Sequence, residues 1–383
     1  METEKDVYRE LQRELDTMPV GFPATKSGVE IRLLKHLFTP EEAEIALNLS
    51  ALPESLERIH KRAKKRGIGI SEENLEQSLD RLVKKGAIMG GRHLAKGRKG
   101  KYYSKAPLAV GMFEAQVNRL SQGFAKDFYD YLLNQGFAEE IHTTQTSQMR
   151  TIPINKSLKP EHHVGTYDDA RQIVMKSDGP FAVINCVCRQ AKDLLGEPCK
   201  LTDIRETCLL LRGFAKALIK SRVGRELSKE EMLQLLDRAE EVGMVLQPEN
   251  NQNPLFICCC CGCCCGVLTS VKKFPRPAEY FETNFYVQTD PELCNGCEVC
   301  LDRCPMDARS MLDGIAMVDL DRCIGCGLCV TTCEQNAIQL MKKEKETVPP
   351  KDHDSLYKKI MMEKVGPWGT LKIMGKALTG MKI

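Results

Sequence analysis

Residues 294–304 read CNGCEVCLDRC and residues 323–333 read CIGCGLCVTTC, two copies of the spacing C-x2-C-x2-C-x3-C. Three closely spaced cysteines on a tight loop can bind three corners of a cubic four-iron cluster, and the fourth cysteine, at the start of a short helix, points to the other cluster. The spacing therefore predicts two [4Fe-4S] clusters. We assign the ligands as Cys294, Cys297, Cys300 and Cys333 for cluster one, and Cys323, Cys326, Cys329 and Cys304 for cluster two.

Zinc is the main alternative for cysteines at such short spacing. A structural zinc site needs four ligands, usually as two separate C-x2-C pairs. Six of these eight cysteines lie in triplets, which one tetrahedral ion cannot use. Gly296, Gly325 and Gly327 lie among the ligands, where the backbone must bend tightly and direct N–H groups at sulfur. The pattern favours iron–sulfur clusters.

With predicted strands at 285–288 and 314–318, these motifs resemble the bacterial dicluster ferredoxin domain, over about residues 285–341. The resemblance implies a pseudo-symmetric fold of two strand–loop–helix halves that exchanges single electrons with redox partners. One position departs from the family: Cys333 is followed by Glu334, where the family usually has proline. Because proline fixes the turn into the helix, we expect a softer turn and an added negative charge near cluster one.

The composition is that of an intracellular metal-binding protein. The chain has 383 residues, enough for two or three domains. Nineteen cysteines in such a protein point to metal ligands rather than disulfides. The first residues are charged and resemble no signal peptide, and no run of about 18 apolar residues predicts a membrane span. We expect a cytoplasmic protein.

The N-terminal part predicts a winged helix-turn-helix. Thr39 and Glu42 form the pattern of a capping box, Ser71 precedes an amphipathic helix that Gly86 ends, and residues 87–89 and 102–104 read as short strands. The stretch between the strands is glycine-rich and basic. A long helix is predicted to follow, from Ala106 to Gly136.

This winged helix has two interpretations, DNA binding and protein docking. From Leu56 to Lys105 there are 15 Lys and Arg residues against 5 Asp and Glu residues. In DNA binding, the helix between Ser71 and Gly86 would lie in the major groove. This helix carries four carboxylates that would repel phosphate, which favours docking. The carboxylates are Glu72, Glu73, Glu76 and Asp80, and the wing cations are Arg92, Lys96, Arg98, Lys99 and Lys101.

The middle of the chain carries eleven further cysteines. A buried strand is predicted at 181–185, running into the CVCRQ motif, where Arg189 could offset thiolate charge. Residues 256–266 read FICCCCGCCCG, and neighbouring side chains of an extended segment point to opposite sides, so the seven cysteines of this run cannot all bind one centre. The candidate ligands of a further centre are Cys186, Cys188, Cys199, Cys208, Cys258, Cys259, Cys260, Cys261, Cys263, Cys264 and Cys265.

Three kinds of chemistry fit these eleven thiols: a third iron–sulfur cluster, a zinc ion, or a reactive dithiol. Their number and softness favour iron–sulfur, and zinc competes because no cysteine triplet appears here. The order of winged helix, CxCR segment, cysteine run and dicluster domain resembles a group of anaerobic 4Fe-4S dicluster proteins, over about residues 31–341.

The sequence thus predicts an α+β multidomain protein: a winged-helix domain with its long helix (1–136), a cysteine-rich α/β domain (137–275), a ferredoxin-like dicluster domain (276–345) and a tail (346–383). We expect an electron-transfer protein, either a ferredoxin-type carrier or a redox subunit of an oxidoreductase, with a flavoprotein or another oxidoreductase as partner. No catalytic constellation is apparent in the sequence. The alternative is an iron–sulfur redox sensor that binds DNA through the winged helix.

Overall fold

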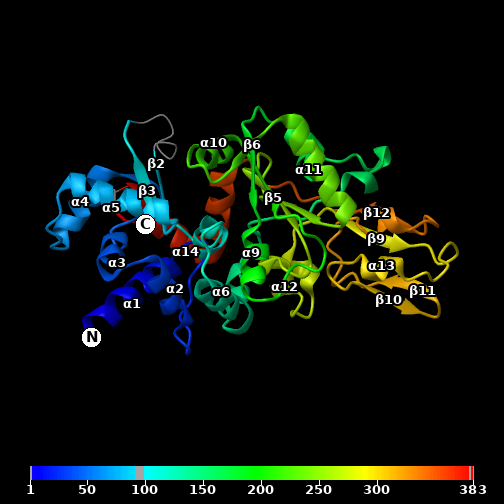
Figure 1. Cartoon of the computed structure of the whole chain (residues 1–383), viewed down its shortest axis with the longest axis horizontal. Helices are drawn as coiled ribbons and strands as arrows, with labels where there is room; N and C mark the ends of the chain where they lie inside the picture. Colours follow the sequence, from blue (N-terminus) through cyan, green and yellow to red (C-terminus); the bar gives the residue numbers. More distant parts are fainter. Residues whose placement is uncertain (1, 92–98, 379–380, 383) are drawn as a thin grey trace. The chain divides into compact units, whose positions relative to one another are not determined.

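The computed structural model describes residues 2–91, 99–378 and 381–382. The chain divides into two compact units, which we describe separately. The first unit contains Met1–Thr144 and Ile360–Ile383, and the second contains Gln145–Lys359. Both units combine helices and strands (Figure 1).

The first unit is mainly helical. Its helices have their apolar sides in a shared core, in which Phe113 stacks on Phe128 with ring centroids 3.6 Å apart. Thr39 accepts a hydrogen bond from the Glu42 amide and Glu42 accepts one from Thr39, which confirms the predicted capping box. The helices are α1 (Glu2–Asp16), α2 (Val29–Leu37), α3 (Pro40–Ala46), α4 (Leu56–Lys65), α5 (Glu72–Lys85), α6 (Gln122–Asn134) and α7 (Phe137–Ile141).

A three-stranded antiparallel sheet accompanies α5. It has the order β1–β3–β2, with β1 at Glu54–Ser55, β2 at Ile88–Gly91 and β3 at Tyr102–Lys105. Ser71 caps α5, and Gly86 ends it with a φ of 72°, a conformation that favours glycine. The order of helix, strand and strand is the predicted one, while the tip of the wing (92–98), with Arg92, Lys96 and Arg98, lies outside the described residues.

The prediction of one long helix from Ala106 to Gly136 is wrong. Residues Leu108–Met112 and Glu114–Gln116 form short irregular turns, and the regular helix α6 begins only at Gln122. Two residues account for the difference. Pro107 has an extended backbone and precedes the turns, and the Ser121 hydroxyl accepts a hydrogen bond from the Phe124 amide, which fixes a new helix start.

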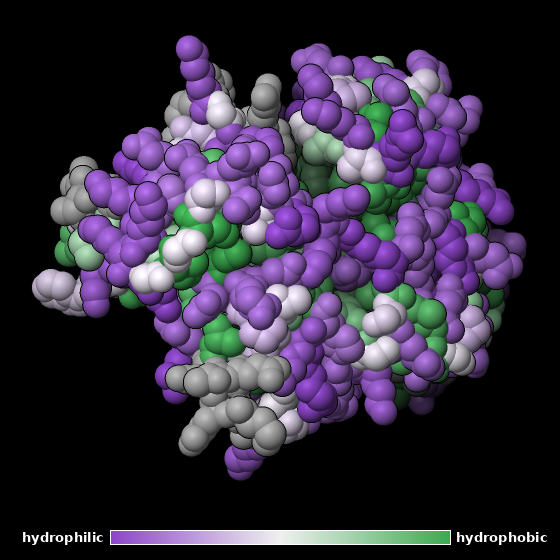
Figure 2. Space-filling model, turned by 60° about the vertical axis from the view of Figure 1, so that its left-hand side comes forward, coloured by the Kyte–Doolittle hydropathy of each residue, from purple (hydrophilic) through white to green (hydrophobic). Residues whose placement is uncertain are grey.

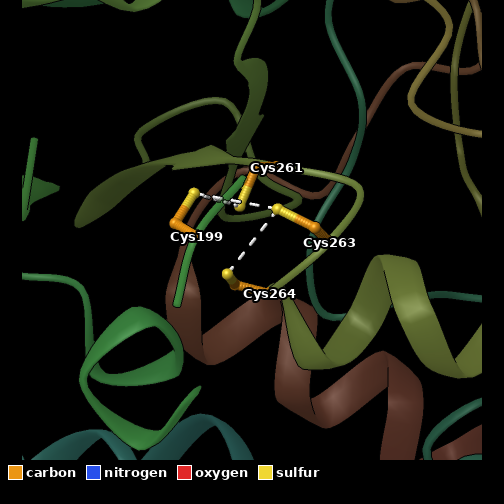
Figure 3. A group of neighbouring side chains, drawn as sticks. All are labelled: Cys199, Cys261, Cys263 and Cys264. Carbon is orange, nitrogen blue, oxygen red and sulfur yellow. Dashed lines mark hydrogen bonds between the residues drawn. The ribbon is translucent and has the colours of Figure 1, made fainter. Parts of the chain in front are cut away.

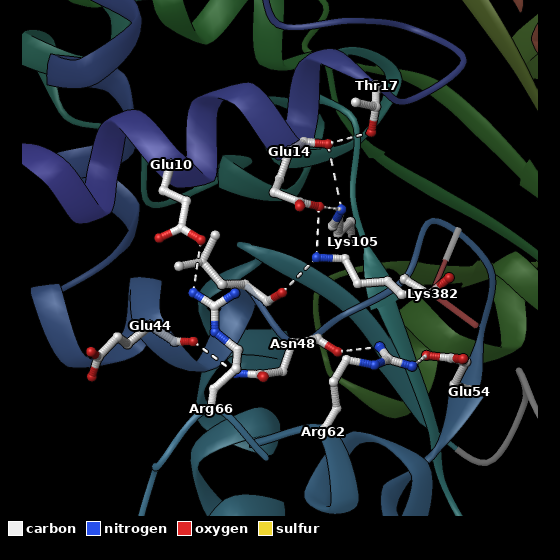
Figure 4. A network of polar contacts seen from close by, with 12 residues as sticks. Glu10, Glu14, Thr17, Glu44, Asn48, Glu54, Arg62, Arg66, Lys105 and Lys382 are labelled. Carbon is white, nitrogen blue, oxygen red and sulfur yellow. Dashed lines mark hydrogen bonds and ion pairs between the residues drawn. The ribbon is translucent and has the colours of Figure 1, made fainter. Parts of the chain in front are cut away.

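A polar network joins three distant segments of the first unit (Figure 4). Glu14 of α1 forms an ion pair of 2.6 Å with Lys105 of β3 and a second one of 2.7 Å with Lys382 near the C-terminus. Lys105 is almost fully buried, at 2% exposure. Because burial disfavours a charge and Lys382 repels it, the pKa of Lys105 falls to about 8 despite its ion pair with Glu14.

The second unit contains a five-stranded antiparallel sheet. Its order is β6–β4–β5–β8–β7, and β4 coincides with the buried strand predicted at 181–185. Cys208 of β5 pairs directly with Cys258 of β8, so the pairing brings two distant cysteine segments together. The strands are β4 (Phe181–Asn185), β5 (Glu206–Leu211), β6 (Arg225–Leu227), β7 (Val245–Pro248) and β8 (Phe256–Cys260).

Short helices flank this sheet. The longest of them, α11, begins at a capping box in which Ser228 and Glu231 bond reciprocally, as a serine followed three residues later by a glutamate predicts. Its buried side chains, Met232 and Leu236 among them, join the core of the sheet. The helices are α8 (Ala170–Met175), α9 (Val187–Leu194), α10 (Arg212–Lys220), α11 (Lys229–Val242) and α12 (Gly266–Val271).

Two antiparallel hairpin-like pairs form the C-terminal part of the second unit, side by side in Figure 1. In one pair β9 (Phe285–Thr289) bonds to β12 (Ile338–Lys342), and in the other β10 (Arg309–Leu312) bonds to β11 (Ile315–Val318). The short helix α13 (Val299–Asp302) lies between β9 and β10 in the chain. The first cysteine motif lies between β9 and β10 in the chain and the second between β11 and β12, so each pair takes one strand from each half, as the dicluster resemblance implied.

The tail forms one interrupted helix, α14 (His353–Leu378), in which Gly366 has a φ of 67° and precedes Pro367. Among the described residues, no helix is long and apolar enough to cross a membrane. Hydrophilic side chains cover most of the face in Figure 2, and apolar side chains appear there only in separate patches.

Candidate metal centres

Four cysteines from the two motifs line one small cavity in the C-terminal part of the second unit. They are Cys304 from the first motif and Cys323, Cys326 and Cys329 from the second. Cys326 and Cys329 are buried, and the Ala308 amide donates a hydrogen bond of 3.3 Å to Cys304 Sγ. These are the four residues that the sequence assigned to cluster two, and the structure brings them together across the two motifs.

Three of the four residues assigned to cluster one belong to, or pack against, the core next to β9. Cys300 is buried there, with Cys294 and Cys333 packed against the same core, and Cys297 is exposed. The Ala316 amide donates to Cys294 Sγ over 3.4 Å. This hydrogen bond, with one from Gly296, lowers the pKa of the Cys294 thiol. N–H groups directed at sulfur are what a thiolate ligand requires.

Glycine is needed at two positions beside these cysteines. Gly296 has a φ of 71°, and a Cβ atom there would lie only 2.6 Å from the Gly314 carbonyl oxygen. Gly325 has a φ of 64°, and its Cβ atom would collide with the Phe285 carbonyl group. Both loops can therefore pass close to a neighbouring backbone segment only because these residues lack side chains.

The hydrogen bonds of Arg309 indicate whether the residues of this site fit an iron–sulfur cluster. The residue is 7% exposed and lines the cavity, and its guanidinium donates to Cys300 Sγ over 3.7 Å and to Thr289 Oγ1 over 2.9 Å. Among the described residues its Nε and Nη1 atoms have no hydrogen-bond partner, although both are buried. A cluster supplies inorganic sulfides that accept such bonds and negative charge that offsets the cation. The residues fit the group.

The middle cysteines separate into two groups and one lone residue. The first group consists of Cys199, from the segment between α9 and β5, with Cys261, Cys263 and Cys264, from the segment between β8 and α12 (Figure 3). All four sulfur atoms lie within 4.8 Å of one another. A hydrogen bond from Cys264 outweighs burial and lowers the pKa of Cys261 to about 4, so this group favours a thiolate.

The second group is a chain of thiols joined by side-chain hydrogen bonds. Bonds from Cys188 and Cys260 outweigh burial and lower the pKa of Cys265 to about 5, so a thiolate is favoured here as well. Cys259, by contrast, points to the other side of β8, where it lies beside Leu209 and Met244. In order along the chain of contacts, the second group is Cys186, Cys188, Cys265, Cys260, Cys258 and Cys208.

Arg189 provides the positive charge beside these thiols. The residue is fully buried, and it donates to Thr207 Oγ1 and, over 3.3 Å, to the Cys259 carbonyl oxygen. Burial opposes its charge, but the charges of Cys186 and Cys261 outweigh burial and raise the pKa of Arg189. Arg189 therefore stabilises negative charge on thiolates of both groups.

One of the wing cations is paired with carboxylates of α5. Lys101, one of the five wing cations, contacts Asp80 at 2.5 Å and Glu76 at 3.1 Å, and Tyr103 donates to Asp80 over 2.8 Å. Lys101 is thus neutralised by the carboxylates of the helix that DNA binding would place in the groove. The alternative of a DNA-binding regulator gains no support.

Residues 286–344 match the family model described as the 4Fe-4S dicluster domain. The predicted resemblance to a dicluster ferredoxin domain is confirmed for this part of the chain, and the protein is an iron–sulfur protein with at least one [4Fe-4S] cluster. None of the curated proteins and none of the solved structures compared with the chain is significantly similar to it. All nineteen cysteines lie among the described residues, and none of them forms a disulfide.

Sequence reasoning missed Arg309 and the division of the middle cysteines. Arg309 lies five residues after Cys304 and carries no signal of its own, since arginines are common near strands. The grouping of Cys199 with Cys261, Cys263 and Cys264 depends on how two distant segments meet. Alternation along β8 did predict that its cysteines would point to two sides, which the position of Cys259 confirms.

Proposed function

We propose that this protein transfers single electrons through two [4Fe-4S] clusters, as a ferredoxin-type carrier or a redox subunit of an oxidoreductase. The observation that carries the proposal is the cavity shared by Cys304 and the three cysteines of the second motif. A cysteine that crosses to the other motif is the ligand pattern of two-cluster ferredoxins. Cluster one would be held by Cys294, Cys297, Cys300 and Cys333.

When bound, such clusters accept and release one electron at a time. The contribution of the chain is to hold the thiolates, direct amides at sulfur and keep water away. The amides of Ala308 and Ala316 and the buried cation of Arg309 would stabilise negative charge on the reduced form. With the ligand sets interleaved, the two clusters would lie close enough for electrons to pass between them.

We propose a redox protein, such as a flavoprotein or an oxidoreductase, as the partner. The helix α4 exposes a group of basic side chains that would attract an acidic protein surface and speed encounter. In this proposal α4, α5 and the strands β2 and β3 form a winged helix that serves for docking. The basic side chains are Arg58, Lys61, Lys64, Lys65 and Arg66.

Iron and acid-labile sulfide analysis of anaerobically purified protein tests the two clusters. We expect about eight irons and eight sulfides per chain from the cysteine motifs, with an EPR signal of interacting clusters after reduction. About four irons would contradict the two-cluster proposal. An anaerobic pull-down tests the role: recovery of an oxidoreductase supports a carrier, and recovery of specific DNA fragments without such a partner contradicts it.

A further inference from the structure

The four sulfur atoms of Cys199, Cys261, Cys263 and Cys264 form a compact group (Figure 3). Three of their separations are equal: Cys199 to Cys261, Cys199 to Cys263 and Cys263 to Cys264 are each 3.7 Å. The other pairs lie within 4.8 Å. The side chains come from two loops and point at a common centre.

These separations have the size of a site for one metal ion. A tetrahedral zinc ion bound at a Zn–S length of about 2.3 Å places its sulfur ligands roughly 3.8 Å apart, since the edge of a tetrahedron is about 1.6 times the distance from centre to corner. In a cubic four-iron cluster each thiolate binds a different iron, so the separation of the irons adds to the distance between sulfurs. The observed 3.7 Å fits the single ion and is too short for the cluster.

The number and surroundings of the ligands specify the kind of site. Four thiolates complete a tetrahedral shell and leave no open position, which is typical of structural zinc sites. Such a site with a divalent ion carries two negative charges, and Arg189 is the buried cation beside Cys199 and Cys261. A single Fe²⁺ ion has the same geometry, but a given site binds Zn²⁺ more tightly than Fe²⁺.

We propose that Cys199, Cys261, Cys263 and Cys264 bind one Zn²⁺ ion that fastens the Cys199 loop to the loop before α12. This goes beyond the proposed electron transfer and does not depend on it. Because Zn²⁺ has no redox chemistry, the site is structural and lies outside the path of the electrons. Any further iron–sulfur centre of the middle cysteines then has only the second group of thiols, which includes Cys186 and Cys188, as its ligands.

Metal analysis of a single variant tests the proposal. The wild-type protein, purified anaerobically from medium with both metals and washed with chelator, should contain about one zinc per chain besides its iron. Cys263→Ser changes one of the two ligands that are only half-buried and should lose the zinc while the iron content stays unchanged. The matched control is Cys259→Ala, a buried thiol of the same run outside the group, which should keep both metals.

X-ray absorption at the zinc edge of the wild-type protein gives an answer even if the variant folds poorly. We expect a single shell of four sulfur atoms at about 2.3 Å. Three results would overturn the proposal: wild-type protein without zinc, a shell that contains nitrogen or oxygen, and loss of iron instead of zinc from Cys263→Ser. The zinc readout is independent of the iron readout that tests the clusters.

Discussion

The guanidinium of Arg309 donates to Cys300 Sγ over 3.7 Å while it lines the cavity that holds Cys304. One buried cation therefore bonds to a residue assigned to cluster one and lines the same cavity as the residues assigned to cluster two. Two of its nitrogen atoms, Nε and Nη1, have no partner in the described part of the chain. A positive charge in this position favours the reduced, more negative form of a cluster, so Arg309 should help to set the reduction potential.

Replacement of this charge should lower the potentials. In Arg309→Gln we expect more negative midpoint potentials for both clusters, because the reduced form loses a buried cation beside its ligands. A loss of about 1.4 kcal/mol of this stabilisation corresponds to about 60 mV for a one-electron couple. Potentiometric titration followed by EPR measures the change. Arg276→Gln, at an exposed arginine paired with Glu279 and Asp321, is the control, and equal shifts in both variants would contradict the role of Arg309.

The interleaved ligand sets predict which cluster each fourth cysteine serves. Cys304→Ser should destabilise the cluster bound by the second motif, because Cys304 shares a cavity with Cys323, Cys326 and Cys329. Cys333→Ser should instead damage the cluster of the first motif. Iron content with EPR of each variant, combined with alkylation mapping of the released cysteines, identifies the damaged cluster. Release of the cysteines of the mutated motif itself would show that each motif binds its own cluster.

Most features decided by neighbouring residues were predicted, whereas the grouping of the middle cysteines, which depends on distant pairing, was not. The capping boxes at Thr39 and Ser228 depend on residues three positions apart, so the sequence contains the whole interaction. The pairing of Cys208 with Cys258 joins residues fifty positions apart, and no spacing rule predicts which cysteines it brings together. The wrong prediction of one long helix had a local cause. The apolar periodicity of residues 106–136 predicts a continuous helix, although Pro107 and Ser121 favour a break and a new helix start.

The ion pair of the buried Lys105 with the half-buried Glu14 predicts a pH dependence of stability. The pKa of Lys105 is about 8 in the folded protein, because of burial and of repulsion by Lys382, and about 10.4 in an unfolded chain. Between these values the unfolded state binds more protons, so stability rises with pH. Relative to Lys105→Met, the wild-type protein should therefore gain stability from about pH 8 to pH 10.

Thermal unfolding of both proteins across this range measures the difference in Tm. Because the same titrating thiols are present in both chains, the difference isolates Lys105. Glu14→Gln is the opposite perturbation: it leaves Lys105 and Lys382 without their shared carboxylate and should lower the stability by about 3 kcal/mol at neutral pH. A wild-type Tm that falls relative to that of Lys105→Met as the pH rises would contradict the predicted sign of the effect.

The two groups of middle thiols should respond separately to mutation. The double variant Cys186→Ser/Cys188→Ser removes one end of the second group and leaves Cys199, Cys261, Cys263 and Cys264 untouched. If the first group alone binds zinc, this variant keeps its zinc. Loss of iron from this variant would show that the second group binds a further iron–sulfur centre. The EPR signals of the dicluster domain should remain unchanged. The zinc and iron contents of the double variant and of Cys263→Ser are measured side by side. Loss of zinc from the double variant would show that Cys186 or Cys188 belongs to the zinc site.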